Sequence, residues 1–135
     1  MLAPRMERIG CHWIFDGYGA EAVRLDDEAL LRQALEGLPD LLGLRKVAPA
    51  QSFRHEAGQE RTVAGIVLLA ESHLSLHAFA AQGVVHGDLF SCKPFDVESA
   101  RGYLARVFGL RGFHEELLER RTPGRGQLDL SRHGT

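Results

Sequence analysis

TVAGIVLLAESHLSLHAFAAQGVVHGDLFS, residues 62–91, holds three apolar runs in close succession. The runs cover residues 62–70, 73–79 and 84–91, and only short links interrupt them. Short apolar runs separated by so few residues are typical of antiparallel strands that follow one another in a sheet. We therefore predict a three-stranded meander at the centre of the fold.

Further strands are predicted on both sides of this meander. Residues 10–18, GCHWIFDGY, are rich in aromatic and β-branched residues, which is typical of a strand. Residues 44–53 have the composition of a second strand, and Pro49 places it at a sheet edge or a bulge. The polar segment 54–61 is expected to be a loop or hairpin tip, and residues 113–120 form the last predicted strand.

Two segments have the periodicity of amphipathic helices. Residues 26–38 carry leucine and alanine at helical spacing after two aspartates, and Gly37 and Pro39 are expected to end this helix. Residues 96–110 repeat the pattern, with Asp96 in position to cap the helix. The order β-α-β-β-β-β-α-β predicts an α+β fold, a two-layer sandwich in which two helices pack on one face of a mainly antiparallel sheet.

The composition suits one compact domain spanning residues 1–135, with a loose tail over residues 122–135. The formal net charge of -2 does not favour a nucleic-acid partner or an anionic membrane surface. No apolar run is long enough to span a membrane, and the first residues lack the apolar core of a signal peptide, so we expect a cytoplasmic protein. Two cysteines, Cys11 and Cys92, are too few for a disulfide framework and are expected to be reduced.

The predicted strand 73–79 has an unusual polar face. Strand alternation places the leucines on one side and His73, Ser75 and His77 on the other. This face alone fits a half-exposed structural strand. A metal site is disfavoured, even with help from His86 or Cys92, because two histidines four residues apart on a strand are too far apart to share one ion easily. A Ser-His hydrolase is disfavoured because no G-x-S-x-G elbow is present.

The segment AESHLSLH, followed by GDLFSC with its cysteine twenty positions after Ser72, resembles the processing and active-site core of the S-adenosylmethionine decarboxylase family. The short prokaryotic form is the most similar. The likeness extends more loosely to GCHWIFD near the start and to the predicted helix over residues 96–110. It therefore covers most of the chain.

The resemblance implies that the chain cleaves itself between Glu71 and Ser72. The Ser72 hydroxyl would attack the carbonyl carbon of Glu71, and elimination would leave a pyruvoyl group at the head of residues 72–135. Residues 1–71 would become the second chain. A ketone of this kind accepts the electrons released when an amino acid loses CO₂, a task for which protein side chains are poorly suited.

Roles for further residues come from the same resemblance. His77 matches the histidine that removes the Ser72 Cα proton, and Cys92 matches the acid that returns a proton to carbon. Glu71 serves as context for the cleavage, and His73 is expected to be structural or a neighbour of the substrate site. An ideal strand would place Ser72 and His77 on opposite faces, so the two can meet only if the chain bends near residues 71–72.

The substrate stays open between two α-amino acids. The family default, S-adenosylmethionine, would serve spermidine synthesis in polyamine metabolism. Where the family continues with Thr-Trp-Pro-Glu, this chain has Ala78, Phe79, Ala80 and Ala81, so no carboxylate stands at position 81 to hold the ribose hydroxyls. L-ornithine or L-arginine is therefore the alternative substrate, and no substrate-binding residue is assigned.

A third interpretation is a chain that is never processed and serves as a non-catalytic partner of an active relative. Ala64 supports it, because the family has Ser or Thr there to help the self-cleavage, although Thr62 could take over. Lys93 replaces a glycine that is usual after the cysteine. The resemblance further implies a homodimer of cleaved protomers with active sites near the interface. No metal-binding residue is assigned.

Overall fold

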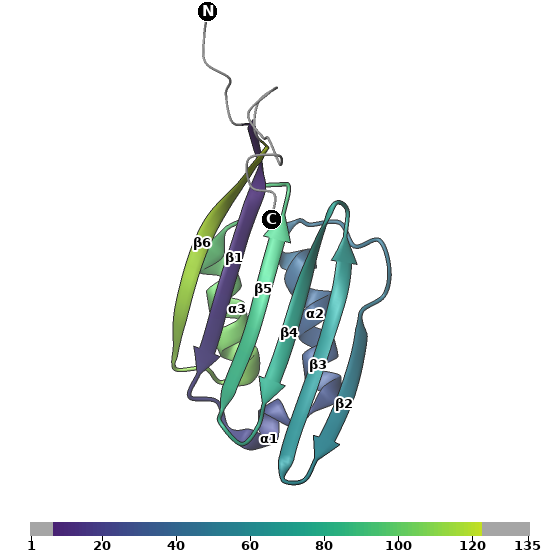
Figure 1. Cartoon of the computed structure of the whole chain (residues 1–135), viewed down its shortest axis with the longest axis vertical. Coiled ribbons are helices and arrows are strands. Elements are labelled where there is room, and N and C mark those ends of the chain that lie inside the picture. The colour runs from purple at the N-terminus through teal and green to yellow at the C-terminus, as the bar shows by residue number, and fades with distance from the viewer. Residues whose placement is uncertain (1–6, 123–135) are drawn as a thin grey trace, which may run out of the picture.

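The computed structural model describes residues 7–122, and the elements of this part of the chain are labelled in Figure 1. Strands and helices follow in the order β1 (Glu7–Tyr18), α1 (Ala22–Leu25), α2 (Glu28–Leu42), β2 (Gln51–Ala57), β3 (Glu60–Leu69), β4 (Ser72–Phe79), β5 (Val84–Ser91), α3 (Val97–Phe108) and β6 (Gly112–Thr122). The short helix α1 was not predicted from the sequence.

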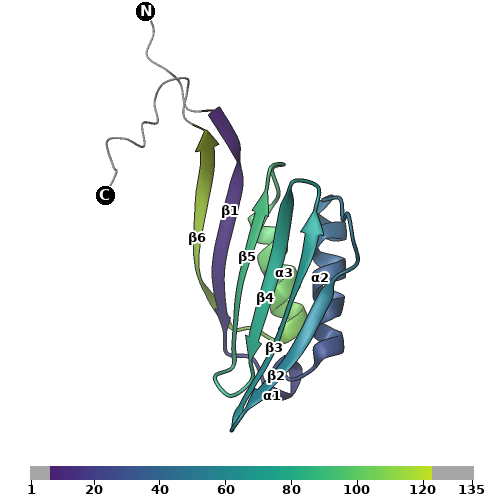
Figure 2. The same ribbon diagram turned by 45° about the vertical axis from the view of Figure 1, so that its right-hand side comes forward.

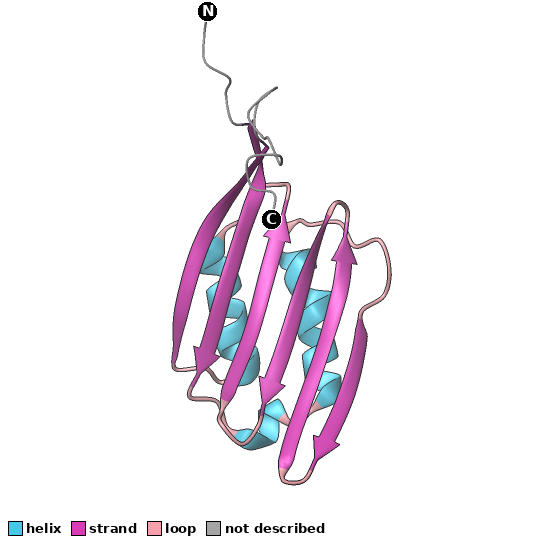
Figure 3. Cartoon of the chain, viewed as in Figure 1, coloured by secondary structure: helices cyan, strands magenta, loops and turns pink. Residues whose placement is uncertain are grey.

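The strands form one sheet in the order β2-β3-β4-β5-β1-β6, and every pairing between neighbours is antiparallel. Strands β2 to β5 are neighbours in sequence, whereas β1 lies between β5 and β6. Helices α2 and α3 lie side by side on the same face of the sheet. In Figures 1 and 3 they are seen behind the strands, and Figure 2 shows the two layers from an oblique angle. The predicted two-layer α+β sandwich is confirmed.

The core lies between the sheet and the helices, because alternate strand residues point towards the helices. On β4 these are Leu74, Leu76 and Ala78, all fully buried, and β1 adds Trp13 and Phe15, whose rings stack at 4.1 Å. The intervening residues point to the other face of the sheet, which no helix of residues 7–122 covers (Figure 2). We call this second face the open face.

Helix α2 is longer than predicted. Its N-cap is Asp27, whose side chain accepts a hydrogen bond from the Leu30 backbone N–H at 3.1 Å. The prediction that Gly37 and Pro39 end the helix was wrong: it runs to Leu42 and ends at Gly43, which adopts the left-handed conformation. Proline removes one N–H and clashes with the preceding turn, but Pro39 is buried near the end of the helix, where tertiary packing outweighs this local cost.

Strand β2 lies later in the chain than predicted. It starts at Gln51, after Pro49, and continues through residues 54–57, which were expected to form a loop. Only the predicted hairpin tip is confirmed, at Gly58, where φ is +63°. Because β2 is an edge strand in which all residues but the half-buried Ser52 are exposed, its polar residues do not prevent pairing with β3.

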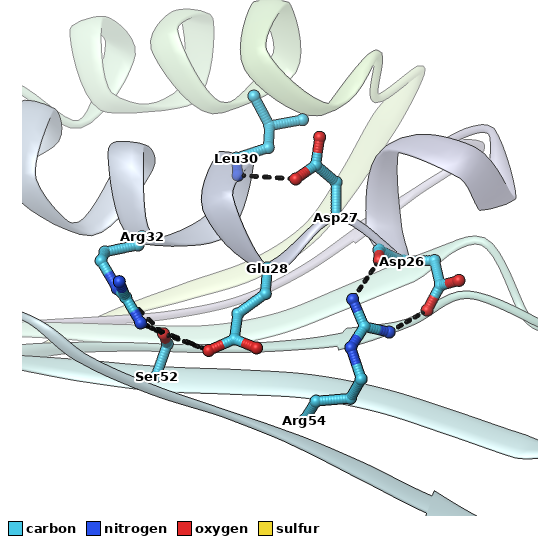
Figure 4. A network of polar contacts seen from close by, with 7 residues as sticks. All are labelled: Asp26, Asp27, Glu28, Leu30, Arg32, Ser52 and Arg54. Atoms are coloured by element: carbon cyan, nitrogen blue, oxygen red, sulfur yellow. Dashed lines mark hydrogen bonds and ion pairs between the residues drawn. The ribbon is translucent and has the colours of Figure 1, made fainter.

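Polar contacts join β2 to the start of α2 (Figure 4). Arg54 donates to the Asp26 carboxylate at 2.5 Å and to the Asp26 backbone carbonyl at 2.6 Å. Ser52 donates to Glu28 at 2.8 Å and accepts from Arg32 at 2.6 Å. These contacts hold the edge strand against the helix layer.

Two expectations concern the ends of the chain and membranes. Residues 123–135, nearly all of the predicted loose tail, lie outside the described residues, while Thr122 ends β6. Among residues 7–122, no helix combines the length and apolarity needed to cross a membrane.

Candidate active site

The peptide bond between Glu71 and Ser72 lies in the tight turn between β3 and β4. Leu69 pairs with Ser72, so only Ala70 and Glu71 connect the two strands. Glu71 has φ of +59° and is the one non-glycine residue with a positive φ in the described part of the chain. A side chain in the left-handed region costs about 1–2 kcal/mol. The surrounding pairing therefore holds this peptide in a strained conformation.

Cys92 lies directly beside this turn. Its thiol donates a hydrogen bond to the carbonyl oxygen of Glu71, with 3.1 Å between sulfur and oxygen. Cys92 follows β5, which pairs with β4, and Ser91 holds the chain there by donating to the Lys93 carbonyl and accepting from the Lys93 N–H. The structure thus brings together Glu71, Ser72 and Cys92, three residues that the sequence singled out.

The Ser72 hydroxyl is partly exposed and donates to the Ala70 carbonyl at 3.1 Å. This hydroxyl is therefore engaged within the turn, with the Ala70 carbonyl as its acceptor. Attack on the Glu71 carbonyl carbon requires this hydrogen bond to break, and rotation about the Ser72 Cα–Cβ bond can release the hydroxyl, because side chains move between staggered positions.

His77 does not meet Ser72 within one chain. The chain turns sharply at Glu71, but Ser72 to His77 form one continuous strand beyond the turn. Five strand residues span about 16 Å. His77 instead lies in mid-strand between Ala64 on β3 and His86 on β5. The expected bend therefore does not bring the two residues together.

A second polar group lies on the open face near this end of β4. The Asp88 carboxylate on β5 contacts His12 Nε2 on β1 at 2.6 Å and His73 Nε2 on β4 at 2.8 Å. Ser75 donates to its other oxygen. We call these four residues the Asp88 cluster. Burial alone raises the pKa of Asp88, but the hydrogen bonds from Ser75, His12 and His73 outweigh burial, so the pKa lies below its ordinary value.

The sequence pattern did not single out His12 and Asp88 as members of a site. Strand alternation places each on the same side as His73, since Trp13 and Leu89 point into the core. Alternation could not show that β1 lies next to β5. That neighbourhood depends on the strand order.

The Asp88 cluster contains the donor atoms that a divalent metal ion would need. Ligand atoms of His12, His73 and Asp88 lie within 4.8 Å of one another. However, Arg120 approaches the Nδ1 atom of His12 at 3.3 Å. Because a guanidinium can only donate, this contact leaves Nδ1 as the acceptor and places the ring proton on Nε2, facing Asp88. The arrangement favours a hydrogen-bonded network over metal coordination.

Two hollows flank β4. One of about 240 Å³ lies on the open face and is lined by Phe53, Ala64, Gly65, Ile66, Ser75 and His77. Ala64 therefore lies beside His77, and Thr62 is two residues along the same strand. Ala81 lies in the turn after β4 and lines a separate hollow of about 410 Å³.

Fold and site together define a class of protein: a two-layer α+β sandwich that holds an internal Glu-Ser peptide at a strained turn beside a thiol. The model of the S-adenosylmethionine decarboxylase family matches residues 11–121. The chain therefore belongs to the S-adenosylmethionine decarboxylase family, and the resemblance drawn from its sequence is confirmed.

Individual relatives agree with this assignment. The S-adenosylmethionine decarboxylase proenzyme of Persephonella marina is 31% identical over 120 residues, which cover 84% of this chain and 84% of that protein. The proenzyme of Archaeoglobus fulgidus is 31% identical over 113 residues, covering 83% and 97%. The crystal structure of the adenosylmethionine decarboxylase from Aquifex aeolicus has a TM-score of 0.75 at 24% identity and covers 91% of this chain and 99% of that chain. This last likeness shows the fold.

Proposed function

We propose that this protein is a self-cleaving S-adenosylmethionine decarboxylase whose pyruvoyl group is generated from Ser72. The observation that carries the proposal is the geometry around the Glu71–Ser72 peptide: a strained turn whose carbonyl accepts a hydrogen bond from Cys92. The matched relatives are named proenzymes, a name that fits a processed chain. By this proposal the enzyme acts in the cytoplasm and serves spermidine synthesis.

The residues at the turn support cleavage in three ways. The Cys92 hydrogen bond draws electron density from the Glu71 carbonyl, which favours attack by the Ser72 oxygen. The bond that forms joins that oxygen to the Glu71 carbon, the peptide C–N bond breaks, and the hydroxyl proton is passed to the Ser72 nitrogen. An ester and a free amine result. Relief of the left-handed strain at Glu71 favours this step.

Removal of the Ser72 Cα proton then expels the Glu71 carboxylate and leaves a dehydroalanine. This enamine tautomerises to an imine, which takes up water and releases ammonia, and the ketone then stands at the head of residues 72–135. A pyruvoyl group fits position 72, because the side chain there is partly exposed at the end of a strand. When present, this group supplies an electron sink for decarboxylation.

Cys92 is placed to act in both stages. Its thiol lies at the carbonyl that precedes residue 72, so it is close to the carbon that must regain a proton after CO₂ leaves. It is only partly buried and carries no disulfide. We therefore propose Cys92 as the general acid of decarboxylation.

His77 can act on Ser72 only if a second copy supplies it, since about 16 Å of strand separates the two within one chain. The open face offers a surface for such a copy, because it carries the exposed apolar side chains Ile14, Tyr18, Phe53, Ile66, Leu68 and Leu118. Exposed apolar patches of this kind mark association sites. We propose a homodimer of cleaved protomers that pair through their open faces, with His77 of each copy serving Ser72 of the other.

The substrate proposed is S-adenosylmethionine, in line with the names of the relatives. Ala81 lacks the carboxylate that would bind the ribose, so another group must do so or the ribose is held less tightly. The test incubates purified protein with carboxyl-labelled S-adenosylmethionine, ornithine or arginine and measures released CO₂, alongside intact mass.

CO₂ from S-adenosylmethionine and two fragments that meet at residues 71 and 72 are expected. Release from ornithine or arginine alone would overturn the substrate. A chain that stays whole would overturn the cleavage and support a non-catalytic partner.

A further inference from the structure

Cleavage before Ser72 places the reactive residue at a free chain end, where it must still be held in place. Residue 72 becomes the first residue of its chain, and the preceding residues become the end of the other chain. In the described sheet Ser72 pairs only with Leu69 of β3, whereas pairing with β5 begins at His73. Both members of the Leu69–Ser72 pair therefore lie near free ends, and chain ends fray unless they are held.

The first side chain that can hold this end is His73. It contacts Asp88 at 2.8 Å, and Ser75, two residues further along β4, donates to the same carboxylate. Asp88 itself is well anchored, since β5 pairs with β4 on one side and β1 on the other. Two points of β4 next to residue 72 are thus tied to an interior strand.

The third contact joins the two fragments. His12 belongs to residues 1–71, whereas His73, Ser75 and Asp88 belong to residues 72–135. The Nε2 atom of His12 contacts the same Asp88 oxygen at 2.6 Å. Arg120 fixes the proton of His12 on Nε2 by approaching Nδ1, so that His12 donates to the carboxylate.

Phe90 packs against both imidazoles, whose own ring centroids lie 6.0 Å apart in an edge-to-face arrangement. It pairs with both His12 and His73 across neighbouring strands, and its ring centroid lies 5.5 Å and 6.1 Å from theirs. The Arg120 guanidinium lies 4.7 Å above the same ring. Phe90 and Arg120 therefore restrict the positions of the His12 and His73 rings.

We propose that Asp88 is a positioning residue, which, through His73, Ser75 and His12, holds the head of residues 72–135 in register after cleavage. The proposal rests on the proposed function, because it requires the reactive ketone to be at residue 72. Only an ionised carboxylate can accept from all three donors at once. Replacement by an amide removes the negative charge and leaves an N–H₂ group facing either the two imidazoles or Ser75, whose hydroxyl would then have to turn and accept.

The test compares Asp88→Asn with wild type after cleavage has run to completion. Ketone content is titrated with a hydrazine, so that turnover is expressed per pyruvoyl group. We expect kcat per pyruvoyl to fall by about tenfold to a hundredfold with little change in KM, because a small misplacement of a reacting group has effects of this size. A role in folding alone would lower the yield and melting temperature but leave turnover per pyruvoyl unchanged.

Glu115→Gln is the matched control. Glu115 also accepts two side-chain hydrogen bonds, from Trp13 at 3.0 Å and Arg101 at 2.7 Å, but it lies on β6, away from residue 72. Its turnover per pyruvoyl should equal that of wild type. Ser75→Ala, which keeps both imidazole contacts, should show a smaller fall than Asp88→Asn, and it carries the test if Asp88→Asn does not fold or cleave.

Three results have distinct meanings. A wild-type chain that stays whole would refute the proposed function itself. A cleaved wild type with equal turnover per pyruvoyl in the variants would refute the positioning role. Stoichiometric binding of Zn²⁺ to wild type that is lost in Asp88→Asn would show that the Asp88 cluster is a metal centre. It would overturn the proposed hydrogen-bonded role of Asp88.

Discussion

The thiol of Cys92 donates a hydrogen bond to the carbonyl oxygen of Glu71, although 21 positions separate the two residues in the sequence. The contact depends on the pairing of β4 with β5, which places the end of β5 beside the turn that precedes β4. This hydrogen bond links the proposed general acid of decarboxylation to the carbonyl at which the chain is proposed to cleave. The Cys92 side chain is thus proposed to take part in both self-cleavage and decarboxylation.

Cys92→Ala should affect both reactions to different extents. Cleavage should slow but still finish on long incubation, because the turn strain at Glu71 remains. Turnover of the cleaved enzyme should fall by on the order of 10²-fold or more, since a positioned general acid contributes about that much. Intact mass over time follows the first effect and CO₂ release the second. Undiminished turnover would exclude Cys92 as the acid.

Ser72→Ala and His77→Ala should complement each other. Alone, Ser72→Ala should stay whole, and His77→Ala should cleave more slowly by on the order of 10²-fold or more. In a mixed dimer, the intact Ser72 of one chain meets the intact His77 of the other. Co-expression should therefore restore one cleaved site per dimer, measured by mass and by CO₂ release.

The matching control co-expresses Ser72→Ala with a Ser72→Ala, His77→Ala double variant, which has no intact serine. No cleavage should occur there. If the two single variants form mixed dimers but fail to complement each other, the proposal that His77 of one copy serves Ser72 of the other is wrong.

Asp88 should make stability depend on acid pH. Its pKa is lowered in the folded protein, so its contribution is fully present above the ordinary carboxyl pKa near 4 and is lost as pH falls through the folded value. The free energy of unfolding of wild type should exceed that of Asp88→Asn down to about pH 4. The difference should shrink below that pH, measured by urea unfolding at several pH values. A difference that grows towards pH 2 would contradict the assignment.

Asp27 should stabilise α2 as its N-cap (Figure 4). Asp27→Ala should lower the free energy of unfolding by about 1 kcal/mol, because the Leu30 N–H loses its partner. Asp27→Ser keeps an acceptor at the same position and should lose less. Urea unfolding of the three proteins measures the differences, and equal stability of all three would show that the cap contributes nothing.

Local patterns in the sequence determined most of the elements and the two faces of the sheet. Alternation placed Leu74 and Leu76 in the core and His73, Ser75 and His77 on the other side, as the structure confirms. The motif around Ser72 was sufficient to identify the family. Errors arose where tertiary packing overrides local preference, as at Pro39, which is buried inside α2 instead of ending it.

Only the tertiary structure decided which distant residues meet. It brought Cys92 to Glu71 and His12 to Asp88, and it kept Ser72 and His77 about 16 Å apart on one strand. Alternation with a period of two is a local property that any strand order satisfies, so the sequence pattern determines the face of each side chain. The neighbours across the sheet depend on β1 entering between β5 and β6, which only the packing of the whole chain selects.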